Sequence, residues 1–373
     1  MKVYLDNAAS TPLDPEVLDA MLPYMRDKHG NPSSIHAYGR ETRAAIDDAR
    51  RRIADHLHVS PGEIFFTSGG TEANNMALQS GVSSLGIKNV ISSKLEHHAV
   101  LHTLEFLEAQ GKVKLHWVNL KEGGAIDLGH VEQLLSENDQ VMVSLMHANN
   151  EIGNLLPTAE TGTLCQANDA VFHSDTVQAI GHYHLDFQEL KLDMAACSGH
   201  KFHGPKSTGF LYVNGDRALQ PFIYGGPQER NRRGGTENVY GIVGLARALD
   251  IAIENLDRDR AHIEGLKAYL ITGLQNAIDD VHFNGESGGD GLYTVLNVSL
   301  PITEKREMLL FNFDINGIAV SGGSACSSGV NEDSHVLSAI GADMERPSVR
   351  ISFSKLNSKD EIDYLVKTLV EIL

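Results

Sequence analysis

The residues Ile64-Phe65-Phe66-Thr67-Ser68-Gly69-Gly70-Thr71-Glu72 hold the pattern that decides the fold. The first four predict a buried strand, the two glycines predict a tight turn, and the run 73–79 predicts a helix that begins directly afterwards. A strand, a turn and a helix in this order are typical of an α/β unit. In such units the ligand binds beyond the carboxyl end of the strand.

The same rhythm continues on both sides of this unit. Helical patterns such as 99–108 and 128–135 separate most of the strand-like runs. This alternation predicts a mostly parallel sheet with helices on both faces. The further predicted strands are 89–92, 113–118, 141–146, 170–173, 193–196 and 209–213.

The pattern changes after Gly234-Gly235. Two long helices are expected, at 239–256 and 258–278, and short strands and helices follow them. We therefore expect a large α/β domain at residues 13–256. A small α+β domain would combine residues 1–12 with residues 257–373.

Composition excludes several classes of protein. The 373 residues suggest two or three folding units at ~150 residues each. Lys and Arg number 31 against 49 Asp and Glu, a net charge of −18, which disfavours nucleic acid and anionic membranes as partners. No Cys-x-x-Cys pair occurs, so neither a disulfide framework nor a cysteine-ligated zinc site is expected. Asp6 precedes any apolar leader, and the longest apolar runs are far below ~20 residues, so we expect a cytoplasmic protein.

Three motifs follow predicted strands. The turn 68–72 exposes backbone N–H groups at a helix N-terminus, which suits a phosphate, although a plain tight turn would look the same. Lys201 follows the segment 193–198, where a lysine can form a Schiff base with a carbonyl cofactor such as pyridoxal phosphate. Lys206 competes for this role. Asp175 also follows a strand and can keep a cofactor ring nitrogen protonated, or simply cap a helix.

Four further features carry chemistry. His97 can serve as an acid or base beside a cofactor, and the segment 146–153 offers amide donors. Arg350 has the guanidinium fork that matches the carboxylate of an amino acid, although a structural ion pair is an equal alternative. Cys326 lies in a run of Ser and Gly (321–329), where an accessible, reactive thiol is expected. The other two cysteines, Cys165 and Cys197, fall in apolar patterns and are expected in the core.

Ordered motifs along the whole chain resemble the pyridoxal-phosphate-dependent cysteine desulfurases of the NifS/IscS type, within the class V aminotransferase group. The resemblance implies a fold type I transferase and a homodimer. The matching motifs are 4–12 (YLDNAASTP), 30–34 (GNPSS), 96–97 (EH), 149–153 (NNEIG), 198–201 (SGHK), 233–236 (RGGT), 324–327 (SACS), Thr71 and Arg350.

The resemblance assigns a role to each site residue. Lys201 would bind the cofactor and transfer protons, His97 would stack on the ring, and Cys326 would attack the substrate sulfur and become a persulfide. Arg350 would bind the substrate carboxylate, and Asn150 would also contact the substrate. The remaining cofactor contacts would come from Gly70, Thr71, Ser198 and His200 at the phosphate, Asp175 at the ring nitrogen, Gln178 and Asn150 at the 3-oxygen side, and Thr236 from the other subunit.

The implied reaction converts L-cysteine to L-alanine and passes sulfur to an acceptor protein for iron–sulfur clusters or other sulfur-containing products. Selenocysteine lyase and a class V transaminase are the alternatives. The first would not need Cys326 because selenide leaves readily, and the second would need a keto-acid acceptor instead.

Overall fold

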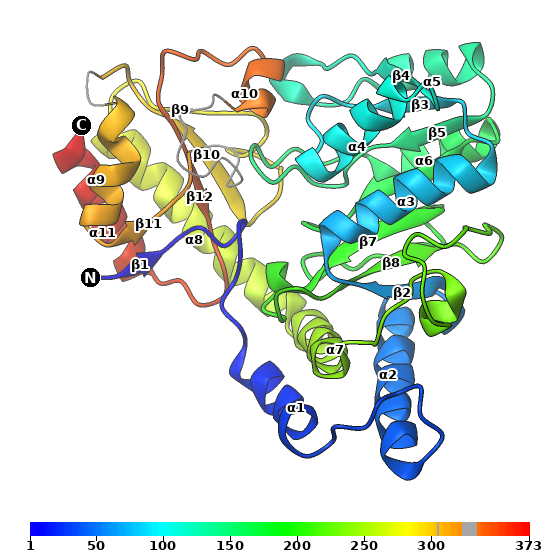
Figure 1. Cartoon of the computed structure of the whole chain (residues 1–373). Coiled ribbons are helices and arrows are strands. Elements are labelled where there is room, and N and C mark those ends of the chain that lie inside the picture. Colours follow the sequence, from blue (N-terminus) through cyan, green and yellow to red (C-terminus); the bar gives the residue numbers. More distant parts are fainter. Residues whose placement is uncertain (304–305, 323–333) are drawn as a thin grey trace.

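A seven-stranded sheet forms the centre of the computed structural model, which describes residues 1–303, 306–322 and 334–373 (Figure 1). Its strand order is β2-β8-β7-β6-β5-β3-β4, and β8 alone among its strands runs antiparallel to its neighbours. The predicted mostly parallel α/β sheet is therefore confirmed. The strands are β2 (Ile64–Thr67), β3 (Asn89–Ser92), β4 (Lys114–Trp117), β5 (Val141–Ser144), β6 (Val171–Asp175), β7 (Met194–Ser198) and β8 (Gly209–Val213).

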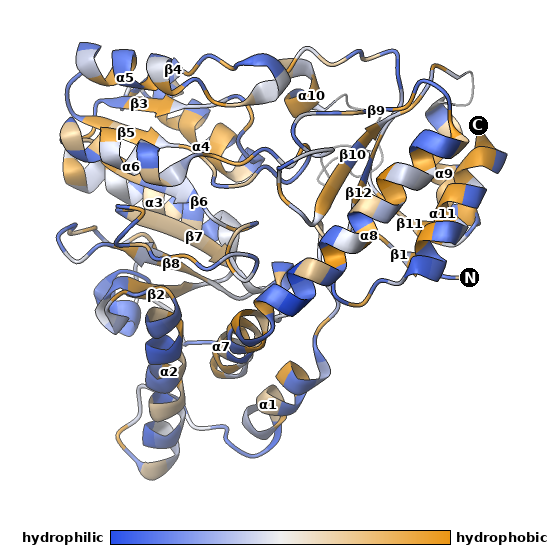
Figure 2. Cartoon of the chain, turned by 180° about the vertical axis from the view of Figure 1, so that it is seen from behind, coloured by the Kyte–Doolittle hydropathy of each residue, from blue (hydrophilic) through white to orange (hydrophobic). Residues whose placement is uncertain are grey.

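Helices pack their apolar sides on both faces of this sheet, because successive strand residues point to opposite faces. Phe65 packs with α3 (Gly70–Leu85) and α4 (His98–Ala109), whereas its neighbours Ile64 and Phe66 pack on the other face. Figure 2 shows the strands as mainly apolar and the helices as mixed. The helices of the other face are α2 (Ala37–His56), α5 (Leu128–Glu137), α6 (Thr158–Ala167) and α7 (Val239–Glu254), with α1 (Pro15–Arg26) packed on α7.

A second apolar core lies beside α8 (Leu256–Ala277), on the side of the molecule where both termini lie (Figure 1). It contains a three-stranded antiparallel sheet and a two-stranded parallel sheet of β1 with β11. The domain boundary expected near residue 256 stays a prediction. The remaining elements are β1 (Val3–Tyr4), β9 (His282–Phe283), β10 (Val295–Ser299), α9 (Leu309–Ile315), β11 (Ile318–Ala319), α10 (His335–Ala339), β12 (Ser348–Ser352) and α11 (Lys359–Ile372).

The segment from Asp6 to Thr11 joins the two parts of the fold. On one side, the Ala8 backbone N–H donates to Ser352 Oγ (2.9 Å), next to the end of β12. On the other, the Thr11 backbone N–H donates to the His200 carbonyl (2.9 Å), and the His203 N–H donates to Thr11 Oγ1 (2.7 Å). The N-terminal residues are therefore placed at the junction of the seven-stranded and the three-stranded sheets.

A buried ion pair covers the edge of β2 that has no neighbouring strand. Arg50 and Glu229 form two hydrogen bonds of 2.8 and 2.7 Å, and both side chains are almost fully buried. Arg50 also donates to the Ile64 carbonyl (2.5 Å), and Glu229 accepts from the Phe66 N–H (2.9 Å). The pair thus occupies the backbone groups that β2, an edge strand, leaves without a neighbouring strand.

The predicted strands of the central sheet agree with the structure to within two residues at each end. The predicted helices 99–108, 128–135, 239–256 and 258–278 agree equally well, whereas the helix expected at 73–79 extends over Gly70–Leu85. The predicted strand 141–146 ends at Ser144. The N–H groups of Leu145 and His147 still donate to carbonyls of β6, but the Met146 N–H between them donates to the Glu96 carboxylate (2.6 Å). Among the described residues, no helix is long and apolar enough to cross a membrane.

Candidate active site

A cavity of about 370 Å³ lies beyond the carboxyl ends of β2, β3, β5, β6 and β7. It collects residues that are far apart in the chain, as expected for an open α/β sheet. The predicted residues that line it are Gly70, Thr71, His97, Asn150, Asp175, Gln178, Ser198, His200, Lys201 and Arg350.

One end of the cavity is built for an anion. Helix α3 begins at Gly70, and its N-cap Gly69 (φ +140°) has no side chain to cap the first N–H groups. Thr71, Ser198 and His200 line the cavity beside this helix end. Burial, together with the positive charges of nearby lysines, lowers the pKa of His200 to about 4, so its ring is neutral at pH 7. These N–H and O–H groups suit a phosphate.

Asp175 supplies a buried carboxylate at the end of β6, with 5% of its surface exposed. Its Oδ2 accepts from Asn74 Nδ2 (2.7 Å) and its Oδ1 accepts from the Val177 N–H (3.0 Å). Asn74 Oδ1 lies 3.1 Å from His173 Nε2, and burial lowers the pKa of His173 to about 3. Neutral His173 therefore donates to Asn74, which fixes the amide so that it donates to Asp175.

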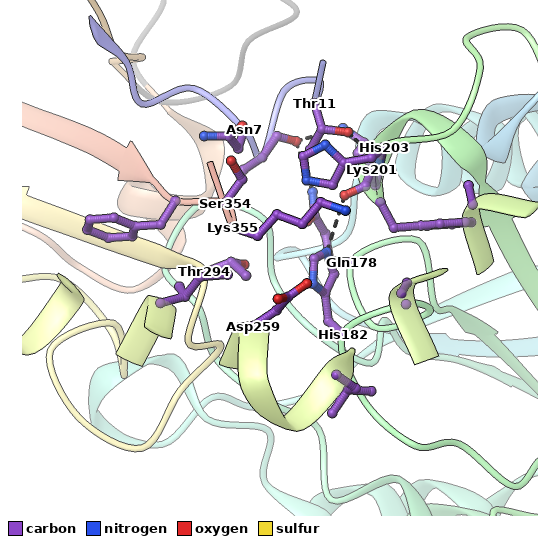
Figure 3. Close-up of a pocket in the computed structure, with 18 of the residues that line it drawn as sticks. Asn7, Thr11, Gln178, His182, Lys201, His203, Asp259, Thr294, Ser354 and Lys355 are labelled. Carbon is purple, nitrogen blue, oxygen red and sulfur yellow. Dashed lines mark hydrogen bonds between the residues drawn. The ribbon is translucent and has the colours of Figure 1, made fainter. Parts of the chain in front are cut away.

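Lys201 ends a short 3₁₀ turn directly after β7. Its Nζ donates to the carbonyls of Ala8 (2.7 Å) and Ala9 (3.0 Å), and Gln178 Nε2 donates to the same Ala8 carbonyl (3.0 Å). A second cavity of about 40 Å³ also borders Lys201, with Gln178 and His182 in its wall (Figure 3). The lysine nitrogen is thus held at the edge of the larger cavity by the N-terminal segment.

His97, His98 and His335 border the cavity near α4, and Glu96 lies next to them. His97 is the N-cap of α4: its Nδ1 accepts from the Ala99 N–H (3.1 Å), and burial lowers its pKa. His98 Nε2 lies 3.1 Å from His335 Nδ1, and His335 Nε2 donates to the Glu96 carbonyl (3.0 Å). Burial raises the pKa of the Glu96 carboxyl well above its usual value. The sequence analysis placed Glu96 in the motif 96–97 without a role of its own, and it assigned no role to His98 or His335.

Arg350 lies on β12 with 1% of its side chain exposed. Its Nη2 donates to Asp6 Oδ1 (2.9 Å) and its Nη1 donates to the Asn150 carbonyl (3.1 Å). A buried guanidinium that reaches the cavity is suited to bind a carboxylate. Arg350 both forms an ion pair and lines the cavity. The two roles considered for it, a structural ion pair and a binding group for a carboxylate, therefore do not exclude each other.

Two predicted site residues are not among the described residues that line the cavity. Thr236 is exposed and is not among the residues lining the cavity of this single chain. Cys326 lies outside the described residues. Cys165 and Cys197 are buried in α6 and β7, as expected, and burial raises the pKa of both thiols.

Known proteins share this arrangement across the whole chain. The family profile "Aminotransferase class-V" matches residues 3–365. The chain belongs to the class V aminotransferase family. Within this family it is 42% identical, over the full chain and 94% of the relative, to a "Cysteine desulfurase IscS" of Dictyoglomus turgidum.

Solved structures resemble this chain over nearly its whole length. A "NIFS-LIKE PROTEIN" is 36% identical, with a TM-score of 0.91 over 100% of this chain and 99% of that one. "SspA in complex with cysteine" is 32% identical, with a TM-score of 0.83 over 96% of this chain and 100% of that one. The resemblance read from the sequence motifs is therefore confirmed, and so is its fold.

Proposed function

We propose that this protein is a cysteine desulfurase that removes sulfur from L-cysteine, yields L-alanine and carries the sulfur as a persulfide on Cys326. One observation carries the proposal. A single cavity combines a helix N-terminus without a side-chain cap, a buried carboxylate, a lysine and a buried arginine, in a chain whose relatives bear that name. A structural neighbour is described in complex with cysteine, which supports cysteine as the substrate.

The cavity fits pyridoxal phosphate. The free N–H groups at the start of α3, with Thr71, Ser198 and His200, would hold the phosphate. Asp175 accepts from Asn74 through Oδ2, and it also lines the cavity. Its carboxylate would therefore keep a proton on the ring nitrogen of the cofactor. When bound, the cofactor supplies an electron sink for the carbon next to the substrate's amino group.

The protein's own groups would bind the substrate and move its protons. Arg350 would take the carboxylate, and Lys201, with its nitrogen at the cavity edge, would attach the cofactor and accept the proton from the α-carbon. Neutral His97 can exchange a proton at Nε2, because its Nδ1 already accepts from the Ala99 N–H. Gln178 and Asn150 would contact the 3-oxygen side of the cofactor.

The sulfur-transfer step needs no added oxidant. The Cys326 thiolate attacks the substrate sulfur, the C–S bond breaks and an S–S bond forms. The substrate's β-carbon gains a proton and becomes the methyl group of alanine. Release of the persulfide sulfur needs a thiol, either from an acceptor protein or from an added reductant.

The decisive assay incubates the purified holoenzyme with L-cysteine and dithiothreitol and measures sulfide and alanine. The wild type should form both in equal amounts, and Cys326→Ser should form neither while binding the cofactor normally. Cys165→Ser is the matched control, because this thiol is buried in the core. Holoenzyme that forms no sulfide would refute the proposal. Retained activity of Cys326→Ser on selenocysteine alone would point to selenocysteine lyase.

The quaternary state belongs to the same proposal. We propose a homodimer in which Thr236 of each chain completes the phosphate site of the other. Thr236 is exposed, and large apolar side chains are exposed elsewhere on the surface, as the partner-binding faces of obligate dimers require. These include Ile35, Tyr38 and Tyr224, with 91%, 59% and 81% exposure. The acceptor would be a protein, such as an iron–sulfur scaffold, and the reaction would take place in the cytoplasm.

A further inference from the structure

Asp6 contacts the arginine that the proposed function assigns to the substrate carboxylate, although no catalytic or binding role was expected for Asp6 itself. Its Oδ1 accepts from Arg350 Nη2 (2.9 Å) and also from Ser321 Oγ (2.7 Å). About a fifth of the Asp6 side chain is exposed, against 1% of Arg350. An arginine buried to this degree requires a nearby negative charge, and Asp6 provides one.

The backbone holds Asp6 in place independently of this ion pair. The Ser352 N–H donates to the Leu5 carbonyl (2.7 Å), and the Asn7 N–H donates to the Ser352 carbonyl (3.4 Å). Asp6 therefore lies alongside Ser352, two residues after Arg350 on β12. Residues two apart on a strand face the same side, so Asp6 lies on the face where the Arg350 side chain projects.

The guanidinium of Arg350 is fixed from two directions. Asp6 accepts from Nη2, while the Asn150 carbonyl accepts from Nη1 (3.1 Å). Contacts to two different nitrogens fix both the position and the plane of the group. The Arg350 backbone is also pinned, because its N–H donates to the Ser321 carbonyl (2.7 Å).

These contacts leave N–H groups of Arg350 for a ligand. Nη1 and Nη2 each carry a second hydrogen, and Nε is a buried donor that has no hydrogen-bond partner among the described residues. Because Arg350 lines the large cavity, a carboxylate bound there would lie beside the guanidinium and meet the second hydrogens of Nη1 and Nη2. Asp6 makes one hydrogen bond to the arginine, rather than the two-point contact that would block the fork.

We propose that Asp6 is a positioning residue: together with the Asn150 carbonyl, it orients Arg350 so that its free N–H groups meet the carboxylate of the substrate. This inference rests on the proposed function for the identity of the ligand, an α-amino acid. Asp6 touches neither the substrate nor the cofactor, and acts through the arginine.

The effect should be confined to carboxylate binding. Arg350 would hold the same carboxylate before and during the reaction, so a disordered Arg350 raises KM and leaves kcat nearly constant. Asp6→Ala should raise KM for L-cysteine about tenfold, the size expected for one charge-assisted hydrogen bond, with kcat within about twofold of wild type. Asp6→Asn keeps an oxygen that accepts from Nη2 and should stay within about threefold of the wild-type KM.

A matched control comes from the same stretch of chain. Asp14 also links the N-terminal segment to the region after β12, through a 2.7 Å ion pair with Lys355, but it does not contact Arg350. Asp14→Ala therefore weakens the same junction without changing the arginine. It should leave KM for L-cysteine within about twofold of wild type.

Binding measured without turnover separates this inference from the proposed function. We would titrate the wild-type and variant holoenzymes with L-alanine and with ethylamine, which has the same amino group and methyl carbon but no carboxylate, using calorimetry. Asp6→Ala should weaken L-alanine about tenfold and leave ethylamine unchanged.

Three results would overturn the inference: unchanged L-alanine affinity in Asp6→Ala, an equal loss for ethylamine, or tighter L-alanine binding, which would make Asp6 a competitor of the substrate. A wild type that releases no sulfide would instead refute the proposed function. The alanine titrations would still decide the role of Asp6 in that case.

Discussion

Replacing Glu229 by alanine should destabilise the protein more than any surface change, because it leaves Arg50 charged and buried without a partner. Removal of one member of a buried ion pair costs about 3–5 kcal/mol. Glu229 is 4% exposed, makes both hydrogen bonds to Arg50 and accepts from the Phe66 N–H. Its removal therefore leaves a buried charge and a buried N–H group without partners, and we expect the full loss. Against a total of about 5–15 kcal/mol, the loss is a large fraction of the stability.

Urea denaturation measures this loss. The fluorescence of Trp117, the one tryptophan of the chain, reports on β4 at the opposite edge of the same sheet. Glu264→Ala is the control, because it breaks an exposed pair with Arg260 (2.7 Å) that should contribute about 0.3–0.5 kcal/mol. Replacing Arg50 and Glu229 together by leucine should recover part of the loss, since no unpaired charge then remains.

Equal shifts of the urea midpoint in Glu229→Ala and Glu264→Ala would contradict this prediction. They would mean that the buried charge of Arg50 is compensated by something other than Glu229.

Three further outcomes follow from the site. Lys201→Ala should abolish sulfide release, and after gel filtration it should lack the visible absorbance of covalently attached pyridoxal phosphate. A retained absorbance band would exclude this lysine as the attachment point. Asn74→Ala removes a donor from the cavity carboxylate and should weaken pyridoxal phosphate binding by the apoprotein about tenfold, measured by fluorescence titration. Acid should destabilise the fold: burial lowers the pKa of His147, His173 and His182 to about 4, 3 and 4, so below pH 6.5 the unfolded chain binds protons that the folded chain does not. Stability that is complete above pH 6.5 is then lost toward pH 4, at about 1.4 kcal/mol per pH unit for each histidine, and a urea midpoint unchanged between pH 7 and pH 5 would contradict this.

Local patterns were sufficient to predict most of the architecture. The strand Ile64–Thr67 and the two glycines after it could be read directly, because hydrophobicity and turn chemistry depend on adjacent residues. The motif order then indicated which strand ends meet at the cavity. Asp175 and Lys201 line it together although 26 residues separate them in the chain, as the topology of a parallel sheet requires.

The contacts that support these residues could not be predicted in this way. Asn74 meets Asp175 across 101 residues, and Asp6 meets Arg350 across 344. Both partners are polar side chains with no local signature, and their roles depend on how distant elements pack. Glu229 is a comparable case: its sequence surroundings, rich in arginine, suggest a solvated loop, whereas the structure buries its carboxylate against the edge of β2.

The parallel pairing of β1 with β11 has a consequence for synthesis on the ribosome. Val3 pairs with Ile318, so the strand that is made first must wait for one that is made more than three hundred residues later. At about 5–20 residues per second, this delay lasts on the order of tens of seconds. During that time the segment that holds Lys201 through the carbonyls of Ala8 and Ala9 lacks its anchors on β11 and β12, such as the hydrogen bond from the Ala8 N–H to Ser352 Oγ. The central sheet can form early, but the cavity is completed only when nearly the whole chain has emerged.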